Sequence, residues 1–330
     1  MNKQDWLATY FYYGEPLEPF LREFIVPLAN DVKEVEGITQ YFFIRYWERG
    51  PHIRLRFKGM ANILYGDIEK KIKDAFKVYL NKYPSKRNKL YEMSDSETQP
   101  NNSLIFAKYY PEVNRYGGQQ AIKVAEKHFQ HSSQIVLNLL SKSKNWDYNQ
   151  AMGEAIKLHL SFVYALGMEI EEAEKFFDYI FEEWFSQATS IDWSQLEKIE
   201  QEKLKNKILN SFQRAFKNQE KTIVPFCRKF WKSLDQKTSE SLKEWITSLN
   251  QTRKRIINIQ QNGNLYTPPE FQINNSLKIP PENQERWRIY QSYVHMTNNR
   301  LGIYNRDEAF LGFLLKKSFE QILKSLAKRN

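Results

Sequence analysis

The sequence contains a single cysteine among its 330 residues, and it has no apolar run of membrane-spanning length. One cysteine excludes an internal disulfide and any metal site built from several cysteines. Cys227 follows the apolar run Ile223–Phe226, so we interpret it as a buried small residue and not as a nucleophile. The first residues, Met1 to Trp6, lack the apolar segment of a signal peptide. The sequence therefore predicts a cytoplasmic protein without a membrane span.

Other chemical signatures are missing as well. The chain has no glycine-rich phosphate loop, no cysteine and histidine set with zinc spacing, and no RNA-recognition signature. His128 and His131 are three residues apart without an evident third ligand, and together with His159 we interpret them as structural residues of amphipathic helices. We therefore expect neither a metal site nor a cofactor.

Apolar and basic residues are plentiful. With 41% apolar and 15% aromatic residues the chain can fill a core, and its length suits one large domain or two closely packed ones. The net charge of +10 fits a nucleic acid, an acidic peptide or protein as partner, or simply a lysine-rich organism. Because the lysines are spread over predicted helices, they favour solvated helix faces, and direct nucleic-acid binding is not expected.

Strand and helix periodicities alternate over the first 116 residues. Alternating or β-rich runs predict strands, and apolar residues at three- and four-residue intervals predict helices. The expected elements are a strand at 6–13, a helix at 16–30 that Pro27 kinks or shortens, strands at 38–47 and 51–57, a helix at 68–83 and a strand at 103–109. This βαββαβ order matches a ferredoxin-like arrangement.

The remainder of the chain is mostly helical. The expected helices cover 118–141, 149–166, 170–187, 195–217, 237–250 and 306–327. The stretch 258–283 contains Asn262-Gly263-Asn264 and two Pro-Pro pairs, which predicts a long loop. The fold class is therefore α+β, as one domain over 1–330 with a ferredoxin-like sheet part at 1–116 and a mainly helical part at 117–330.

The run Pro51–Phe57 is the most informative stretch. As a strand it points three apolar residues to one face and His52, Arg54 and Arg56 to the other. Residues 48–51 are turn-prone and join it to the preceding strand as a hairpin.

The pairing across this hairpin decides which side chains share a face. If Trp47 pairs with His52, then Arg45 lies opposite Arg54, and three guanidiniums share one patch. Like charges repel, so such a patch is explained by an anion that binds there. The alternative is a solvated sheet face that carries solubilising charges.

Two further short motifs contain candidate functional residues. In Arg115-Tyr116-Gly117-Gly118 the glycines permit unusual backbone angles before a helix, where Arg115 could hold an anion. The alternative is an ordinary strand-to-helix turn with an exposed arginine.

The second motif is His295-Met296-Thr297-Asn298-Asn299-Arg300. On a helix, His295 and Asn299 lie on one face, four residues apart. The alternative for a lone histidine is a structural role.

The order of these motifs along the chain resembles that of a known family. Trp6, the strand Phe42–Tyr46, the run Pro51–Arg56, the Arg-Tyr-Gly-Gly motif and the His-Met motif are arranged as in the C-terminal elimination domain of class I lanthipeptide dehydratases. The same domain occurs as stand-alone proteins of thiopeptide-type bacteriocin biosynthesis. The resemblance covers essentially the whole chain.

The resemblance implies a lyase that needs no cofactor. In that family, a larger N-terminal domain transfers glutamate from glutamyl-tRNA to Ser or Thr of a precursor peptide, and the elimination domain expels it to leave dehydroalanine or dehydrobutyrine. The implied catalytic residues are Arg54, Arg56, Arg115 and His295. The candidate substrate-binding residues, chosen by neighbourhood, are Arg45, Tyr46, His52, Tyr116, Asn299 and Arg300.

The resemblance also implies partners. These are a precursor peptide with its leader and, because the glutamylation domain has no counterpart here, a separate glutamyl-tRNA-dependent glutamylation protein. Two other roles stay open: the [4+2] cycloaddition that forms the pyridine ring of thiopeptides, and non-catalytic binding of a leader peptide as an added strand. From its position before His295, the loop 258–283 is expected to act as a lid.

Overall fold

A computed structural model describes residues 3–87, 98–189, 191–235, 238–267 and 279–328. It is an α+β structure and divides into two compact units. The sheet unit comprises Met1–Val113 and Ile122–Asp147, and the helical unit comprises Asn114–Ala121 and Tyr148–Asn330. Among the described residues, no helix combines the length and the apolar character needed to cross a bilayer.

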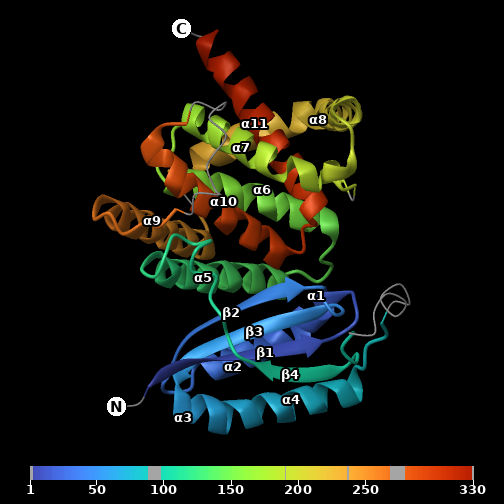
Figure 1. The fold of residues 1–330 in the computed structure, drawn as a ribbon, viewed down its shortest axis with the longest axis vertical. Coiled ribbons are helices and arrows are strands. Elements are labelled where there is room, and N and C mark those ends of the chain that lie inside the picture. Colours follow the sequence, from blue (N-terminus) through green and yellow to red (C-terminus); the bar gives the residue numbers. More distant parts are fainter. Residues whose placement is uncertain (1–2, 88–97, 190, 236–237, 268–278, 329–330) are drawn as a thin grey trace. The chain divides into compact units, whose positions relative to one another are not determined.

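Four antiparallel strands form the sheet, in the order β2-β3-β1-β4 (Figure 1). The strands are β1 (Gln4–Tyr12), β2 (Ile38–Tyr46), β3 (His52–Met60) and β4 (Ser103–Ala107). The helical segments of the unit are α1 (Leu17–Phe20), a π-helical turn (Leu21–Ile25), α2 (Val26–Lys33), α3 (Ala61–Ile63), a second π-helical turn (Leu64–Ile68), α4 (Glu69–Lys82) and α5 (Ala121–Lys142). Pro27 stands in the first turn of α2, directly after a π-helical turn, where its missing N–H interrupts the helix ladder.

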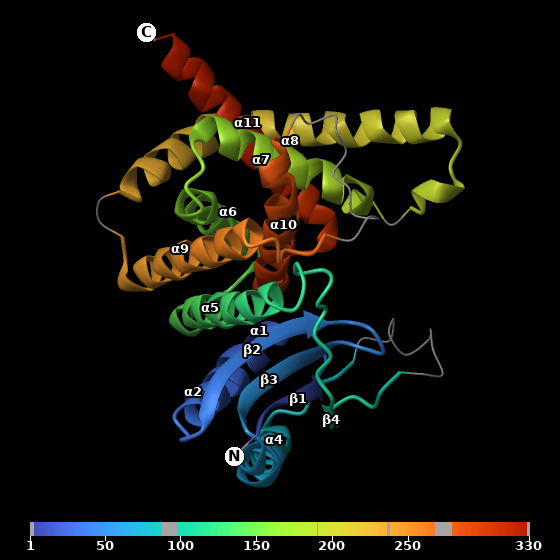
Figure 2. The same ribbon diagram turned by 60° about the vertical axis from the view of Figure 1, so that its left-hand side comes forward.

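The two faces of the sheet differ because side chains alternate along each strand. One face packs on α1, α2 and α4, where Phe11 lies 5.9 Å from Phe20, 5.4 Å from Phe24 and 5.1 Å from Phe76 between ring centres. The other face carries His52, Arg54 and Arg56. Figure 2 shows α4 and α5 on opposite sides of the sheet.

Helix α5 packs on the arginine-bearing face. The ring of Phe129 lies 5.3 Å from that of Phe42, and Ser133 Oγ accepts a hydrogen bond from the backbone N–H of Phe43 over 3.1 Å. These contacts place α5 in the sheet unit. The sequence-based division at 116/117 therefore differs from the units of the structure.

The predicted register of the hairpin is wrong by one residue. His52 pairs with Tyr46, and Arg54 pairs with Ile44, because the turn holds five residues and not four. A shift of one residue moves a side chain to the opposite face. Arg45 accordingly points to the face that packs on α1, α2 and α4, where it is 3% exposed and its Nη1 lies 2.6 Å from Glu18 Oε1. The predicted patch of three guanidiniums does not form.

The helical unit is built from long helices. They are α6 (Tyr148–Ala165), α7 (Ile170–Trp184), α8 (Lys198–Ser233), α9 (Glu240–Gln261), α10 (Pro281–Leu301) and α11 (Asn305–Ala327), with 3-10 turns at Phe185–Ala188 and Trp193–Gln195. In the core, Phe177 of α7 stacks on Phe319 of α11, and Phe176 meets the buried ring of Trp287 from α10.

Two predictions in this unit need correction. Helix α8 runs to Ser233 and not to 217, with Pro225 accommodated in its interior. The expected loop does not begin at 258, since α9 continues to Gln261, and α10 begins at Pro281, before the predicted loop end at 283. Residues 268–278 of that loop, and with them the predicted lid, lie outside the described residues. Cys227 is buried as predicted, and burial raises the pKa of its thiol to about 11.

Candidate functional site

Arg54 is held in one orientation on the sheet. Its Cζ lies 3.5 Å from the ring centre of Tyr46 and 4.6 Å from that of Tyr10, and its Nε donates a hydrogen bond to His52 Nε2 over 2.9 Å. Within the described part of the chain, the only carboxylate within 4.0 Å is Glu48, whose Oε2 is 3.9 Å from Nη2. The side chain is 18% exposed. The guanidinium therefore keeps Nη donors for an external anion.

His52 lies behind Arg54 and is 0% exposed. Its Nδ1 donates to the carbonyl of Gly50 over 2.9 Å, so Nε2 is the acceptor for Arg54. Burial, assisted by the charge of Arg54, lowers the pKa of His52 to about 4. His52, which the sequence predicts to bind substrate, is thus suited to orient Arg54.

The low pKa of His52 predicts a loss of stability in mild acid. Its pKa is about 4 in the folded chain, against about 6.5 in the unfolded chain, so the unfolded state binds the proton first as the pH falls. The free energy of unfolding should decrease between about pH 6.5 and about pH 4, by at most about 3 kcal/mol for this residue. Urea denaturation of wild type and His52→Gln across this range measures it. An equal pH dependence in both proteins would exclude His52 as the source.

Arg56 and Lys58 continue the row of cations along β3. The Cζ of Arg56 lies 4.7 Å from the ring centre of Tyr109 and 5.2 Å from that of Phe42, and burial lowers the pKa of its guanidinium. Nζ of Lys58 lies 3.6 Å from Oε2 of Glu126 on α5. Burial raises the pKa of this carboxyl group. Arg56 is thus clamped between rings, and Lys58 is compensated by a partner from α5.

The Arg-Tyr-Gly-Gly motif belongs to the helical unit. Nε of Arg115 lies 3.5 Å from Oγ of Ser292 on α10, at the limit of a hydrogen bond, and the side chain is partly buried. Tyr116 is buried and stacks on Tyr293 at 6.0 Å. The motif is therefore packed on α10.

Gly117 is required by conformation and by space. Its φ is +86°, in the left-handed region, as the sequence led us to expect. A Cβ at this position would lie 2.6 Å from Cδ1 of Ile289 and 2.8 Å from Cδ1 of Leu265. Its carbonyl also accepts a hydrogen bond from Tyr266 N over 2.9 Å. In this structure, the glycine backbone approaches neighbouring protein side chains.

His295 ends a buried hydrogen-bonded chain in the helical unit. Its Nδ1 lies 2.8 Å from Oε1 of Glu308, and Oε2 of Glu308 accepts from Nδ2 of Asn298 over 3.1 Å. Oδ1 of Asn298 lies 2.7 Å from Nε2 of His159, which is therefore the donor. Burial lowers the pKa of His159 to about 4. The neutral His159 thus fixes the amide of Asn298, and the amide fixes the carboxylate.

This chain orients the catalytic candidate. The ring of His295 stacks on Trp184, with centres 4.4 Å apart, and its side chain is 14% exposed. Glu308 is 1% exposed. Because Glu308 accepts the proton on Nδ1, Nε2 of His295 carries the lone pair. This is the arrangement of a positioned general base.

The predicted site residues fall into both units. His52, Arg54, Arg56 and Tyr46 share one sheet face, whereas Arg45 lies on the other. The helical unit contains Arg115, Tyr116, His295, Asn299 and Arg300. Arg300 is 0% exposed and donates from Nη1 to the carbonyl of Met296 over 2.7 Å, which suits it to bracing α10.

Several residues of these clusters were missed from the sequence. They are Tyr10, Tyr109, Trp184, Glu308, Asn298 and Glu126. Tyr10 had a usable signal, since β1 is an aromatic strand. The partners of His295 had none, because the His159–Asn298 contact joins residues 139 positions apart.

Comparison with known proteins assigns the chain to a family. The model of the family described as lantibiotic biosynthesis dehydratase, C-terminal, matches residues 6–319. Among curated proteins, the chain is 32% identical over 137 residues to the subtilin biosynthesis protein SpaB of Bacillus subtilis. It is 29% identical over 143 residues to the nisin biosynthesis protein NisB of Lactococcus lactis subsp. lactis. These matches cover 41% and 43% of this chain but only 12% of either relative.

Solved structures share the fold. The pyridine synthase TbtD from thiomuracin biosynthesis matches with a TM-score of 0.71 and 14% identity, over 96% of this chain and 98% of TbtD. The tRNA-dependent lantibiotic dehydratase MibB from Microbispora sp. 107891 matches with a TM-score of 0.59 and 19% identity, over 97% of this chain and 28% of MibB. Because the family model matches residues 6–319, nearly the whole of this chain, the chain belongs to the lantibiotic biosynthesis dehydratase C-terminal family.

Proposed function

We propose that this chain eliminates glutamate from glutamylated Ser or Thr residues of a precursor peptide. The observation that carries the proposal is the buried Glu308 carboxylate on Nδ1 of His295, which leaves Nε2 as a base. The residue types of the implied catalytic set, Arg54, Arg56, Arg115 and His295, are all present.

The reaction requires removal of a proton next to an amide carbonyl. In the proposed step, His295 Nε2 takes the Cα proton, and the C–H electron pair forms the Cα=Cβ bond. The Cβ–O bond breaks and glutamate leaves as a carboxylate, while the imidazolium returns its proton to water. A positioned base of this kind contributes about 10²–10⁴-fold to the rate.

The arginines are suited to stabilise the negative charges that the reaction involves. Negative charge develops on the carbonyl oxygen, and the glutamyl group itself carries carboxylates, which take paired hydrogen bonds from guanidinium. We propose that Arg54 and Arg115 bind the glutamyl carboxylates or the negatively charged carbonyl oxygen. Arg56, clamped between aromatic rings, supports the charge of the sheet face from deeper in the structure.

The test uses a synthetic peptide that carries one glutamylated serine. Incubated with the pure chain, it should lose one glutamic acid per site in the mass spectrum, and the dehydroalanine should then form an adduct with an added thiol. A peptide that keeps its glutamyl group under conditions where the chain is folded would contradict the proposal.

A second candidate is formation of a pyridine ring from two dehydroalanines. It is favoured by the likeness to TbtD, which this chain matches over nearly the full length of both proteins. In the same assay, ring closure of a dehydroalanine-rich peptide with loss of its leader, and no action on the glutamyl peptide, would select this candidate.

The proposal also concerns the domain extent, the cellular compartment, the substrate and the sheet arrangement. We infer that residues 1–330 act as one domain of this family, in the cytoplasm, on a peptide already glutamylated by a glutamyl-tRNA-dependent activity. We also assign the sheet to the ferredoxin-like arrangement, because the antiparallel order β2-β3-β1-β4 with helices in both crossovers is the order expected of βαββαβ.

A further inference from the structure

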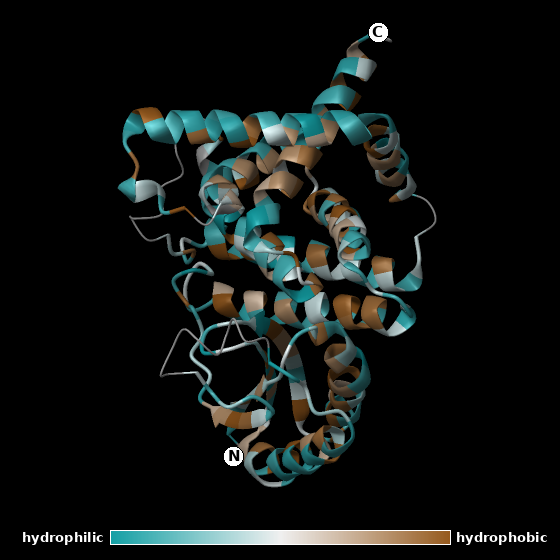
Figure 3. Ribbon diagram, turned by 90° about the vertical axis from the view of Figure 1, so that its right-hand side faces the viewer, coloured by the Kyte–Doolittle hydropathy of each residue, from teal (hydrophilic) through white to brown (hydrophobic). Residues whose placement is uncertain are grey.

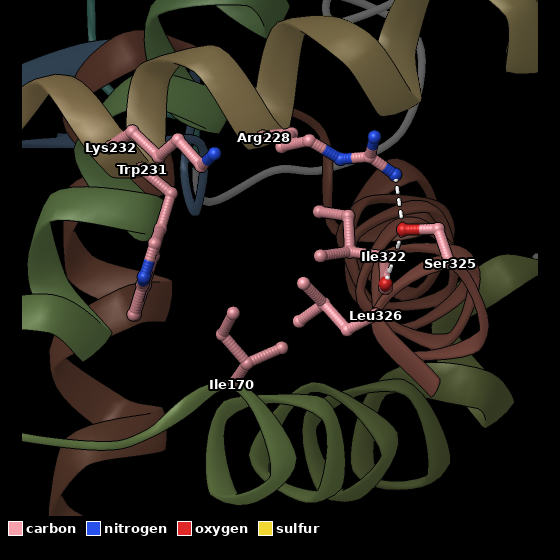
Figure 4. A pocket seen from close by; sticks show the side chains of 7 residues that line it. All are labelled: Ile170, Arg228, Trp231, Lys232, Ile322, Ser325 and Leu326. Atoms are coloured by element: carbon pink, nitrogen blue, oxygen red, sulfur yellow. Dashed lines mark hydrogen bonds between the residues drawn. The ribbon is translucent and has the colours of Figure 1, made fainter. Parts of the chain in front are cut away.

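A small recess opens in the helical unit between the start of α7, the end of α8 and the end of α11 (Figure 4). Its volume is about 50 Å³. The lining residues are Ile170, Arg228, Trp231, Lys232, Ile322, Ser325 and Leu326. None of them belongs to the clusters around His295, Arg115 or Arg54.

The floor and walls of the recess are apolar and well supported. Trp231 is fixed by edge contacts with Phe319 at 5.3 Å and Tyr164 at 5.6 Å between ring centres. Ile322 is buried, whereas Leu326 is 44% exposed although it is a large apolar residue. An exposed leucine beside a preformed apolar recess favours an apolar occupant.

Two cations flank this apolar surface, one turn apart on α8. Arg228 donates from Nη2 to Ser325 Oγ over 2.6 Å, and its Nε is buried without an acceptor among the described residues. In the same part of the chain, no carboxylate forms an ion pair with Arg228 or Lys232. Figure 4 shows both side chains extending from α8 around the recess. The recess is thus bordered by two cations that form no ion pair among the described residues, of which Lys232 is exposed.

The α8 side of the recess is basic, whereas the α7 side carries Glu171 and Glu172 next to Ile170. Helix α8 contains ten lysines and arginines and three glutamates, with no carboxylate after Glu220. Figure 3 shows it as a largely hydrophilic helix with isolated hydrophobic positions. A second copy of a chain with net charge +10 is disfavoured by repulsion. A nucleic-acid backbone would make no apolar contact with the isoleucine and leucine side chains that line the recess.

We propose that this recess binds an acidic peptide segment, with a leucine-like side chain in the apolar part and neighbouring carboxylates on Arg228 and Lys232. Apolar burial holds the side chain, and charge-assisted hydrogen bonds select acidic flanks. This binding is independent of the elimination chemistry proposed above.

The test is fluorescence anisotropy with a labelled peptide of sequence Gly-Asp-Leu-Glu-Gly and the full chain. The double change Arg228→Gln and Lys232→Gln should raise the dissociation constant about tenfold, and so should leucine-to-glycine in the peptide. Lys229→Gln, an exposed neighbour on α8, is the matched control and should change it less than about twofold. Thermal unfolding by circular dichroism checks that each variant is folded.

Three outcomes would overturn the proposal. The first is no binding at about 1 mM peptide, the weak end of specific affinity. The second is an effect of Lys229→Gln as large as that of the double change, which would reduce the binding to general charge. The third is tighter binding of an RNA oligonucleotide that is equally sensitive at Lys229, which would assign the surface to nucleic acid.

Discussion

Replacing Arg54 by glutamine is expected to lower kcat/KM for the proposed glutamate elimination by about 10²–10³-fold with little change in stability. The guanidinium is held by two aromatic rings and by His52, so its Nη donors are pre-oriented toward an anion. Arg54→Lys should recover little of this activity, because an ammonium group lacks the planar fork and the Nε donor for His52. Rates with a glutamylated peptide measure the effect.

The control for this prediction is Arg22→Gln, which removes an equal charge from a partly exposed side chain of the sheet unit (28% exposed) that pairs with Glu23. It should leave the rate within about twofold, as expected for a surface charge. His52→Gln should give an intermediate loss, since glutamine can still accept from Nε. An Arg54→Gln protein that retains most of its activity would remove Arg54 from the reaction.

Replacing Glu308 by glutamine should lower kcat by about 10²–10⁴-fold, by placing the His295 proton on the wrong nitrogen. His159 Nε2 donates to Asn298 Oδ1, so the Asn298 amide must present its N–H to residue 308. The glutamine oxygen then faces Asn298, and its amide N–H faces His295 Nδ1. Nδ1 becomes an acceptor, Nε2 carries the proton, and the base is lost.

A tautomer effect and a general packing effect can be told apart. The first lowers kcat with little change in KM, and it should match the loss in His295→Ala in size. Glu320→Gln, on the same helix and paired with Lys317, is the matched control and should be nearly neutral. Full activity of Glu308→Gln would show that His295 does not depend on this carboxylate.

The sequence predicted those features that depend on local periodicity. The strand at His52–Met60 alternates as expected, whereas α10 (Pro281–Leu301), which carries His295, is not among the expected helices because its apolar residues are few and irregularly spaced. The register of the hairpin was missed because Arg49 and Gly50 both adopt positive φ, at 62° and 107°, in a turn one residue longer than expected. That residue decided on which face Arg45 lies.

Contacts between distant parts of the chain were beyond reach of the sequence. His295 was identified as a candidate from its motif, but Glu308 lies 13 residues later on the next helix, after a turn at Gly302. His159 and Asn298 are connected only through the packing of α6 and α10. Periodicity predicts which face a residue occupies, not which residue of another element meets it.

The assignment of α5 to the sheet unit has a consequence for dividing the chain. The polypeptide passes between the units three times, near residues 113, 121 and 147. No single cut can therefore release both units whole. A fragment ending at 113 would leave Phe42 and Lys58 without Phe129 and Glu126, and the complementary fragment would carry α5 without its sheet. The two segments of the sheet unit are joined only through residues 114–121 of the helical unit, and the two segments of the helical unit are joined only through residues 122–147 of the sheet unit.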